Sequence, residues 1–368
     1  MRIDQLTLSD FRNYDRQTVT FDPRCNIITG ENAQGKTNLL EAITYLSCGR
    51  SPRARSDGEL IAFDRPSARL QGGIFARDRD FAVSIDLYRG KKRKLSVNRV
   101  PAKNAAALSD VFHTVFFCPE DLFLIRDGAA ARRRFLDGCL TKLRPRYAAS
   151  LAAYHKLYDS KTRILRDSDD KPALRDTLPE INSQLANHGA VLIHYRAQLS
   201  EKLNAYAAIA HRDCSGGREE LVLTYQTVNT VETPLTSPIG EIAEQLRTHQ
   251  EAHRAAELDS RQCLSGPHKD DLAVTIGGRD AKTFSSQGQT RTAALALKLA
   301  ERQVYQNATG EAPVLLLDDV LSELDPKRQE FVLNRIAGGQ VFITCCEEDR
   351  LPALLGGRVF HVEQGRIL

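Results

Sequence analysis

The chain has 368 residues, of which 42% are hydrophobic, and this length favours two domains or one large interrupted domain. No stretch approaches the roughly 18 apolar residues of a membrane-spanning helix, and the N-terminus lacks a signal-peptide region, which predicts a cytoplasmic protein without a membrane partner. The net charge of +4 excludes a polybasic chain, and eight cysteines without a C-x-x-C pair indicate reduced thiols rather than a metal site.

A phosphate-binding motif stands near the N-terminus, in the segment ITGENAQGKTNLLEAI at 28–43. It fits the pattern G-x-x-x-x-G-K-[ST], the P-loop that wraps a nucleotide triphosphate. The apolar run before it predicts a buried strand, and apolar residues at helical spacing after Lys36 predict a helix that ends at Gly49. The predicted nucleotide-binding residues are Gly30, Glu31, Asn32, Ala33, Gln34, Gly35, Lys36 and Thr37.

The residue types of this motif suit a nucleotide bound with Mg²⁺. Gly30 and Gly35 allow the backbone to curl until its N–H groups point at phosphate oxygens, and the helix N-terminus adds partial positive charge. We expect Lys36 to reach the β- and γ-phosphates of ATP as a binding and catalytic group, and the Thr37 hydroxyl to bind the metal. The alternative is a glycine turn that matches the pattern by accident.

An acidic strand is needed to complete such a site, and the best candidate is APVLLLDDVLSELD at 312–325. Its continuous apolar run, 314–317, predicts a central parallel strand that is buried on both faces. Two carboxylates at the end of such a strand are costly unless a cation or hydrogen-bond donors compensate them. We expect Asp318 to bind Mg²⁺ and Asp319 to position or activate an attacking water. The alternative is an Asp pair that only caps the next turn.

The two halves of the predicted site are separated by roughly 280 residues, so the middle of the chain is expected to be an insertion. Ala, Leu, Arg and Lys dominate 129–167, with Pro145 as the one interruption, and 179–213 is similar. These stretches predict an antiparallel helical hairpin of ~50–60 Å, with a shorter helix at 238–259. The expected domains are an α/β ATPase head, residues 1–125 and 260–368, and an α-helical lever, residues 126–259.

The segment TFSSQGQTRTAALALKLAERQVY, residues 283–305, leads directly into a predicted helix. It resembles the signature motif of ABC-type ATPases, L-S-G-G-Q. The matching residues are Ser286, Gly288 and Gln289, and the departures are Ser285 and Gln287. In that class this helix N-terminus reaches the γ-phosphate that another subunit holds, and the stretch SELD at 322–325 is similar to the D-loop of the same class. The alternative for the signature segment is a plain Ser/Gln helix cap.

Together these motifs resemble the RecF family of ABC-type ATPases of bacterial recombinational repair. The stretches that carry the resemblance are LTLSDFRNY at 6–14, TGENAQGKTNLLEAITYLSCGRS at 29–51, FCPEDLFLIRDGAAARRRFLD at 117–137, SGPHKDDL at 265–272, SSQGQTRT at 285–292 and LLLDDVLSELD at 315–325. The resemblance implies ATP-dependent homodimerisation and binding to DNA at gaps or at junctions of single and double strands. It also implies loading of RecA with RecO and RecR, and support of the SOS response.

Three departures from the wider ABC class predict slow ATP hydrolysis. The segment FFCPEDL, where a glutamine loop normally senses Mg²⁺, has no Gln, and either Glu120 or Asp121 is left as its substitute. The usual catalytic Glu is replaced by the shorter Asp319, and TCC at 344–346 stands where many members carry a switch His. Slow hydrolysis suits a clamp whose ATP-bound dimer persists, so we expect a weak ATPase that acts as a switch.

Local basic clusters provide candidates for DNA contacts, since aromatic residues make up only 7% of the chain and base stacking is not expected to dominate. The candidates are Arg53, Arg55, Lys91, Lys92 and Arg93. The alternative is that these residues only form a solvated surface and bind no partner. His268, in GPHKDD, is expected to be structural or capping, with a DNA or nucleotide contact as its alternative.

Two other functions compete with this hypothesis. A P-loop kinase or transferase that acts on a small molecule explains the P-loop and Asp318, but it leaves the signature segment and the helical hairpin without a role. A chromosome-scaffold protein of the condensing type would carry a much longer insertion than this chain has.

Overall fold

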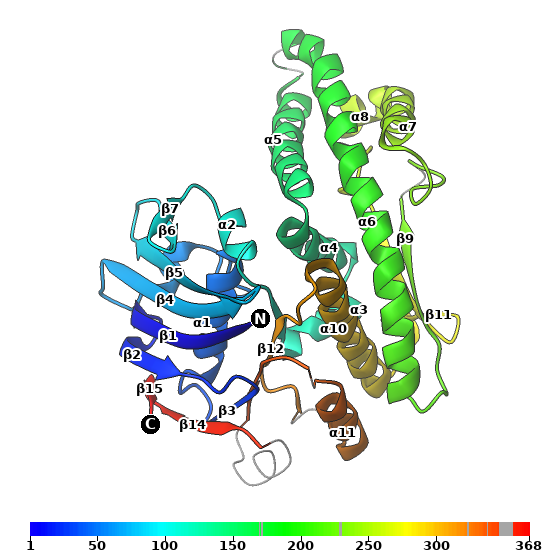
Figure 1. Ribbon diagram of the computed structural model, residues 1–368. Coiled ribbons are helices and arrows are strands. Elements are labelled where there is room, and N and C mark those ends of the chain that lie inside the picture. Colours follow the sequence, from blue (N-terminus) through cyan, green and yellow to red (C-terminus); the bar gives the residue numbers. More distant parts are fainter. Residues whose placement is uncertain (169, 171, 228–229, 322–323, 337, 346–355) are drawn as a thin grey trace. The chain divides into compact units, whose positions relative to one another are not determined.

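The computed structural model divides the chain into two compact units. The first unit contains Met1–Leu122 and Ala294–Leu368, and the second contains Phe123–Ala293 (Figure 1). The described residues are 1–168, 170, 172–227, 230–321, 324–336, 338–345 and 356–368. The second boundary differs from the expected one, because residues 260–293, which the sequence placed in the ATPase head, pack within the second unit.

An antiparallel sheet forms one part of the first unit, in the strand order β2-β1-β4-β5-β6-β7. Its strands are β1 (Arg2–Phe11), β2 (Tyr14–Thr20), β4 (Ser67–Ala76), β5 (Arg79–Tyr88), β6 (Lys94–Val97) and β7 (Val100–Ala102). Along β4, buried positions alternate with more exposed ones, as expected of a sheet with one packed face. The β4–β5 hairpin turns at Arg77 and Asp78, whose positive φ suits a two-residue turn between twisted strands.

The second sheet of this unit has the order β15-β14-β3-β13-β12-β8 and is parallel except for β15. Its strands are β3 (Cys25–Thr29), β8 (Thr114–Phe117), β12 (Val314–Leu317), β13 (Val341–Thr344), β14 (Arg358–Glu363) and β15 (Arg366–Ile367). Every residue of β3, β8, β12 and β13 is buried, and β12 is apolar throughout, as expected of strands that are covered on both faces. The strand predicted at 314–317 is confirmed, since β12 spans the same residues.

Helix α1 (Lys36–Cys48) packs against strands of both sheets, and its apolar residues join the core that the sheets share. The predicted end of this helix is confirmed, because Gly49 has a φ of 61°, the left-handed conformation of a helix C-terminus. Gly72 in β4 allows the helix to approach, since a Cβ there would lie 3.0 Å from Leu46 Cδ1. Further helical segments are α2 (Ala106–Ser109), α11 (Pro326–Arg335), most of α10 (Gln287–Thr309), and 3₁₀ turns at Asp57–Leu60 and Pro119–Leu122.

The second unit combines helices with a small antiparallel sheet, whereas a helical lever was expected. Its helices are α3 (Phe123–Arg126), α4 (Ala129–Leu143), α5 (Pro145–Asp167), α6 (Leu178–Cys214), α7 (Ile239–Ala252), α8 (Arg254–Ser260) and α9 (Ala281–Phe284), with a 3₁₀ turn at Pro172–Thr177. The sheet contains β9 (Leu221–Gln226), β10 (Asp271–Ile276) and β11 (Arg279–Asp280). Pairing of β9 with β10 explains why residues beyond 260 belong to this unit.

The predicted helical hairpin is confirmed in its second arm and corrected in its first. Helix α6 spans 37 residues and contains the expected stretch 179–213. The expected helix at 129–167 is two helices, because Pro145 lacks an N–H and holds Arg144 in an extended conformation, with φ −135° and ψ 98°. The stretch 238–259 is likewise divided, into α7 and α8, at His253.

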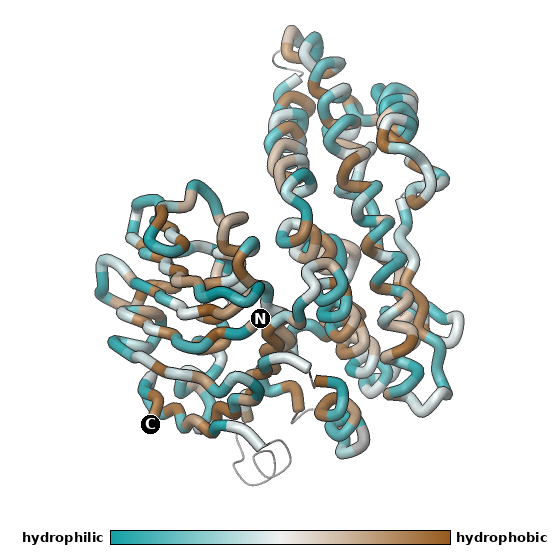
Figure 2. The backbone as a smooth tube through the Cα atoms, in the orientation of Figure 1, coloured by the Kyte–Doolittle hydropathy of each residue, from teal (hydrophilic) through white to brown (hydrophobic). Residues whose placement is uncertain are grey.

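Helix α6 is central to the packing of the second unit, and every residue from Gly189 to Ile193 in its middle is buried. Figure 2 shows hydrophilic and hydrophobic residues interleaved along α6. Ala190 and Ile193 of this helix share a buried cluster with Ile242 and Leu246 of α7. None of the helices in the described part of the chain combines the length and the hydropathy that crossing a membrane requires.

Candidate nucleotide site

The P-loop connects β3 to α1 and needs the two glycines of its motif. Gly30 and Gly35 adopt φ of 136° and 120°, a region that L-residues rarely enter, and Ala33 has a φ of 64°. A Cβ at Gly30 would lie 2.3 Å from the Val362 carbonyl oxygen, and one at Gly35 would lie 2.6 Å from Asn13 Nδ2. The loop is therefore pressed against neighbouring chain on both sides, and glycine is required at these two positions.

Side chains outside the motif hold the P-loop in shape. Asn13 Nδ2 donates to the Gln34 carbonyl oxygen at 2.8 Å, and the Tyr14 hydroxyl donates to the Gly35 carbonyl oxygen at 2.9 Å. From the end of β14, the N–H of Gln364 donates to Gln34 Oε1 at 2.7 Å. No role was predicted for Asn13 or Tyr14, although both lie in the FRNY stretch that carries part of the family resemblance.

Lys36, the first residue of α1, is buried and points into the loop. Its Nζ donates to the carbonyl oxygens of Gly30 at 2.5 Å and Glu31 at 2.9 Å. The ammonium charge therefore lies inside the curl of the loop, next to backbone and a helix N-terminus that favour an anion. This geometry suits the predicted contact with phosphate oxygens.

The acidic strand meets the P-loop, although Thr37 and Asp318 are 281 residues apart in the chain. Thr37 Oγ1 donates to Asp318 Oδ1 at 3.0 Å, and Thr344 Oγ1, at the end of β13, donates to the same oxygen at 2.9 Å. Asp318 is only 6% exposed, and burial raises the pKa of its carboxyl, while the two hydroxyl donors act in the opposite direction. A buried carboxylate next to a threonine hydroxyl is a donor set that suits a hard cation such as Mg²⁺.

Thr344 connects the two acidic residues of the site. Its Oγ1 also accepts a hydrogen bond from the Asp319 N–H at 2.8 Å. Asp319, the second residue after β12, adopts a φ of 53°, in the left-handed region. No role was predicted for Thr344 beyond its place in the TCC stretch that replaces a switch His. It reaches the site because β13 lies between β3 and β12 in the sheet. Ser322 and Glu323 of the D-loop-like stretch, and Cys346, lie outside the described residues.

A buried carboxylate in α1, that of Glu41, anchors the basic loop that follows this helix. Arg12 donates to both of its oxygens, at 2.8 and 2.9 Å, and Ser51 Oγ donates to Oε1 at 2.5 Å. Ser51 Oγ in turn accepts from the Arg53 N–H at 2.9 Å. Arg53 was predicted to contact DNA, yet its charge also acts on Asp318: against the dominant effect of burial, it contributes to lowering the pKa of that carboxyl.

The other basic candidates differ in how they are used. The exposed ones are Arg53, Arg55, Lys91 and Lys92. Arg93 is half-buried, and its Nη1 donates to the Gly49 carbonyl oxygen at 2.6 Å and to the Tyr45 hydroxyl at 2.8 Å. Arg50, Arg55 and Arg93 line one cavity of about 360 Å³. The structure therefore brings three arginines together but commits Arg93 to internal hydrogen bonds.

The signature segment lies at the N-terminus of α10 and forms a reciprocal cap. The Ser286 N–H donates to Gln289 Oε1 at 2.8 Å, and the Gln289 N–H donates to Ser286 Oγ at 3.2 Å. This is the geometry of a capping box, so the alternative of a helix cap is realised in the structure. Ser286 is exposed and Gly288 adds no side chain next to it, so capping does not cover this helix end.

The two candidates for the missing glutamine loop have different surroundings. Asp121 Oδ2 accepts from the Cys118 N–H at 3.0 Å, and its Oδ1 lies 3.8 Å from Lys298 Nζ. Burial raises the pKa of the Asp121 carboxyl, and the Lys298 charge opposes this effect. Glu120 is exposed. Internal contacts therefore occupy Asp121, and Glu120 is the more accessible of the two.

His268 belongs to an internal network of the second unit. Its Nδ1 lies 2.7 Å from the Tyr154 hydroxyl, and its Nε2 lies 3.0 Å from the Cys263 carbonyl oxygen. Burial lowers the pKa of this imidazole to about 4. Both ring nitrogens are used inside the chain, which agrees with the structural hypothesis for this residue.

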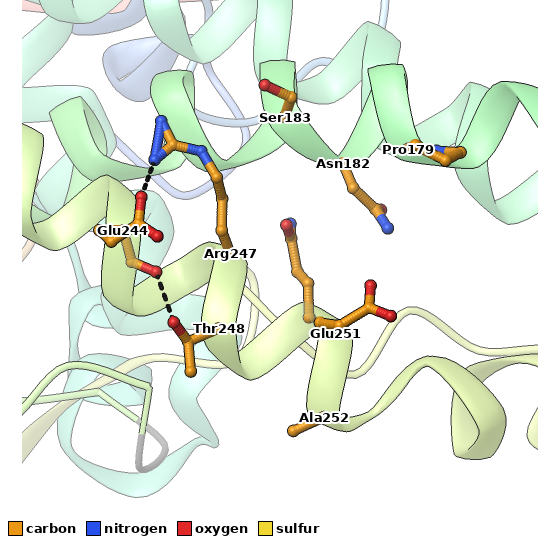
Figure 3. A pocket seen from close by; sticks show the side chains of 9 residues that line it. Pro179, Asn182, Ser183, Glu244, Arg247, Thr248, Glu251 and Ala252 are labelled. Atoms are coloured by element: carbon orange, nitrogen blue, oxygen red, sulfur yellow. Dashed lines mark hydrogen bonds and ion pairs between the residues drawn. The ribbon is translucent and has the colours of Figure 1, made fainter.

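The second unit also contains a cavity of about 530 Å³ between the N-terminal part of α6 and α7 (Figure 3). Glu244 and Arg247 form an ion pair of 2.5 Å on its wall. Asn182 of α6 and Glu251 of α7 also line it. The cavity contains none of the residues predicted for the nucleotide or DNA sites, so it adds nothing to either.

These features define an ATPase of the ABC and SMC type: a P-loop after one parallel strand, a buried Asp at the end of another, and a signature-like helix N-terminus. Residues 2–364 match the family model described as "RecF/RecN/SMC N terminal domain". A solved Smc head domain with an extended coiled coil, from Pyrococcus furiosus, is 14% identical with a TM-score of 0.57, covering 100% of this chain and 95% of that one. That likeness shows the shared fold alone.

The chain belongs to the RecF family. It is 38% identical to the DNA replication and repair protein RecF of Clostridium acetobutylicum, over 100% of this chain and 99% of that protein. Identity to the protein of the same name from Bacillus subtilis is also 38%, over 100% of both chains. A solved structure described as the recombination mediator protein RecF-ATP in the RecFOR pathway is 32% identical, with a TM-score of 0.92, covering 100% of this chain and 96% of that one.

Proposed function

We propose that the chain is an ATP-gated DNA-binding protein of recombinational repair and replication-gap processing, with the first compact unit as its ATPase head and the second as its lever. The observation that carries the proposal is the hydrogen bond between Thr37 and Asp318, which joins the two halves of a nucleotide site across 281 residues. The names of the relatives and the RecF-ATP structure support it. A small-molecule kinase would leave the full-length family match without explanation.

The nucleotide is proposed to bind along the loop Gly30, Glu31, Asn32, Ala33, Gln34, Gly35, Lys36 and Thr37. Lys36 contributes the positive charge for the β- and γ-phosphates. Thr37 and Asp318 are the residues that would hold Mg²⁺, which when bound offsets part of the phosphate charge. Asp319 is proposed to position the attacking water, and because its carboxylate is one methylene shorter than the usual Glu, we expect slow hydrolysis.

ATP binding is further proposed to drive association of two copies of the chain. In the dimer, Ser286, Gly288 and Gln289 of each copy reach the γ-phosphate that the other copy holds. Two features of Ser286 support this role. It lies at the N-terminus of α10, where the helix favours an anion, and it is exposed, so that a second copy can reach it. Each nucleotide site is then complete only in the dimer.

Sedimentation of Ser286→Arg with saturating ATP tests this composite site. The variant is expected to bind ATP through its own P-loop and to stay monomeric, because the bulky cation occupies the space meant for the γ-phosphate. Lys36→Ala is also expected to stay monomeric, because it brings no nucleotide. Ser260→Arg, at an exposed serine of the same unit, serves as the matched control and should dimerise. If Ser286→Arg dimerises like the wild type, the composite site is wrong.

DNA is proposed to contact the exposed residues Arg53, Arg55, Lys91 and Lys92, with Arg93 as a half-buried support. Since these contacts are made to phosphate, affinity for duplex DNA should fall steeply between roughly 50 and 200 mM salt. Lys91→Glu with Lys92→Glu should weaken binding and reduce the salt slope, whereas Lys156→Glu, at an exposed lysine of α5, should not. Fluorescence anisotropy measures both quantities, and a flat salt dependence would refute the electrostatic contact.

By resemblance, the wider role is proposed to be loading of RecA at gaps together with RecO and RecR, and support of the SOS response. The descriptions of two solved RecF structures, one with ATP, name the RecFOR pathway and support this assignment. RecA assembly on gapped DNA, followed with and without this chain in the presence of RecO and RecR, tests it. Equal assembly rates would count against the loading role.

A further inference from the structure

One carboxylate connects the signature segment to the C-terminal end of α6. Gln289 Nε2 donates to Glu219 Oε1 at 2.9 Å, and Glu219 Oε2 lies 3.2 Å from His211 Nε2. His211 lies in the last turn of α6 and is fully buried, with 0% exposure, while Glu219 is half-buried. These residues all belong to the second compact unit.

The chemistry of the partners determines the orientation of the Gln289 amide. A carboxylate only accepts hydrogen bonds, so the amide nitrogen of Gln289 must face Glu219 and its oxygen must face the Ser286 N–H. Likewise, His211 must carry a proton on Nε2 in its contact with the carboxylate. Both ends of the Gln289 amide are therefore used: one caps α10 and the other binds Glu219.

The turn between α6 and β9 presents Glu219 from a defined backbone. Gly216 and Gly217 have φ of 66° and 75°, which reverses the chain directly after α6. On the other side of Glu219, the carbonyl oxygen of Glu220 accepts from the Gly277 N–H at 2.8 Å, in the turn between β10 and β11. The carboxylate thus projects from a segment that both α6 and the small sheet hold.

We propose that Glu219 is a positioning residue for the signature segment: it holds Gln289, and with it the Ser286 end of α10, in the orientation that meets the nucleotide of a second copy. This inference rests on the proposed function of the signature segment. Because His211 binds the same carboxylate, a displacement of the end of α6 is transmitted to Gln289. Within the second unit, the end of α6 and the signature segment are coupled through this contact.

The test compares Glu219→Ala with Glu220→Ala in the presence of a saturating ATP analogue. Both substitutions remove one negative charge, but Glu220 is exposed and contributes its carbonyl oxygen, which alanine retains. Glu219→Ala should bind ATP with wild-type affinity and dimerise about 10-fold more weakly, while Glu220→Ala dimerises like the wild type. Calorimetry measures the first quantity and sedimentation the second. Unchanged dimerisation of Glu219→Ala overturns the proposal.

A double-substitution cycle shows whether Glu219 acts through Gln289. In a Gln289→Ala background, Glu219→Ala should cause no further loss of dimerisation, because the contact is already absent. A second loss of about 10-fold in that background would overturn the proposal. If Glu219→Ala does not fold, Glu219→Asp replaces it: the charge is kept, but the side chain is one methylene too short to reach Gln289. The same loss of dimerisation is expected, and wild-type behaviour of the folded variant overturns the inference.

Ser286→Arg separates failure of this inference from failure of the proposed function. If Ser286→Arg stays monomeric while Glu219→Ala dimerises like the wild type, only the positioning role of Glu219 is wrong. If both variants dimerise like the wild type, the signature segment itself has no role in association. If Ser286→Arg stays monomeric and Glu219→Ala dimerises more weakly than the wild type, the composite site and the positioning role of Glu219 are both supported.

Discussion

Two buried charged groups, one in each compact unit, are compensated in different ways. In the first, Asp318 receives hydrogen bonds from two threonine hydroxyls, and burial raises the pKa of its carboxyl. In the second, buried Arg196 binds both oxygens of Asp137, at 2.9 and 3.0 Å, and also the Pro267 carbonyl oxygen, at 2.7 Å. The first arrangement leaves negative charge for a ligand to compensate, whereas the second is neutralised within the chain. The buried carboxylate of the proposed binding site therefore has neutral hydrogen-bond donors, whereas the carboxylate that stabilises the fold has a charged partner.

Arg196→Met should have the largest effect, a loss of about 3–5 kcal/mol in the free energy of unfolding of the second unit, because it leaves the mostly buried Asp137 carboxylate without its charged partner. Arg166→Met is the matched control: its pair with Asp167 lies on the surface and should contribute only about 0–1 kcal/mol. Urea denaturation followed by circular dichroism measures both. Equal losses would show that the second unit does not depend on its buried pair.

Lys36→Ala tests the binding region of the first unit. ATP affinity should fall roughly 10- to 150-fold, because a hydrogen bond from a charged donor contributes about 1.5–3 kcal/mol. Titration calorimetry with a non-hydrolysable ATP analogue measures the affinity. Lys91→Ala, at an exposed lysine of the same unit, serves as the control and should bind normally. If Lys36→Ala binds as tightly as the wild type, the P-loop assignment is wrong.

Acid should destabilise the second unit through His268. Burial lowers the pKa of this imidazole from the ordinary 6.5 to about 4, so the unfolded chain binds more protons between these values. The stability that this group contributes is complete above pH 6.5 and is lost as the pH falls towards 4, by about 2 kcal/mol between pH 7 and pH 5. His268→Gln should flatten this pH dependence of urea unfolding, and His155→Gln, at an exposed histidine, should not. Parallel pH profiles for all three proteins would contradict this account.

Asp318→Asn should have the smallest effect on stability, and one of opposite sign. Since burial raises the pKa of this carboxyl, its contribution to stability is present at low pH and lost as the pH rises through the folded pKa. The amide removes the charge and keeps an oxygen for Thr37 and Thr344. The nucleotide-free variant should therefore melt roughly 2 °C higher at neutral pH, the size of an effect of about 1 kcal/mol, while its Mg²⁺-dependent ATP binding is lost. A lower melting temperature would contradict the proposed cost of burying the Asp318 charge.

The elements of the nucleotide site could be predicted because each has a local signal. An unbroken apolar run specifies β12, since only a strand covered on both faces tolerates it, and adjacent β-branched residues indicate β3. Helical spacing with a terminal glycine specifies α1. The P-loop follows from its glycines and Lys36. The two helices around Pro145 were within reach of the same local rules, because proline at a helix start ends the helix before it.

Sequence alone therefore determined the motifs, the periods of the main elements and the family, all of which are written in short stretches of neighbouring residues. Tertiary structure decided which side chains complete the site. Thr344 meets Asp318 because β13 lies beside β12, Arg93 turns inward because the end of α1 offers it acceptors, and Glu219 meets Gln289 because β9 pairs with β10. A local pattern specifies the period of a strand or helix, but its neighbour and register depend on packing between segments far apart in the chain.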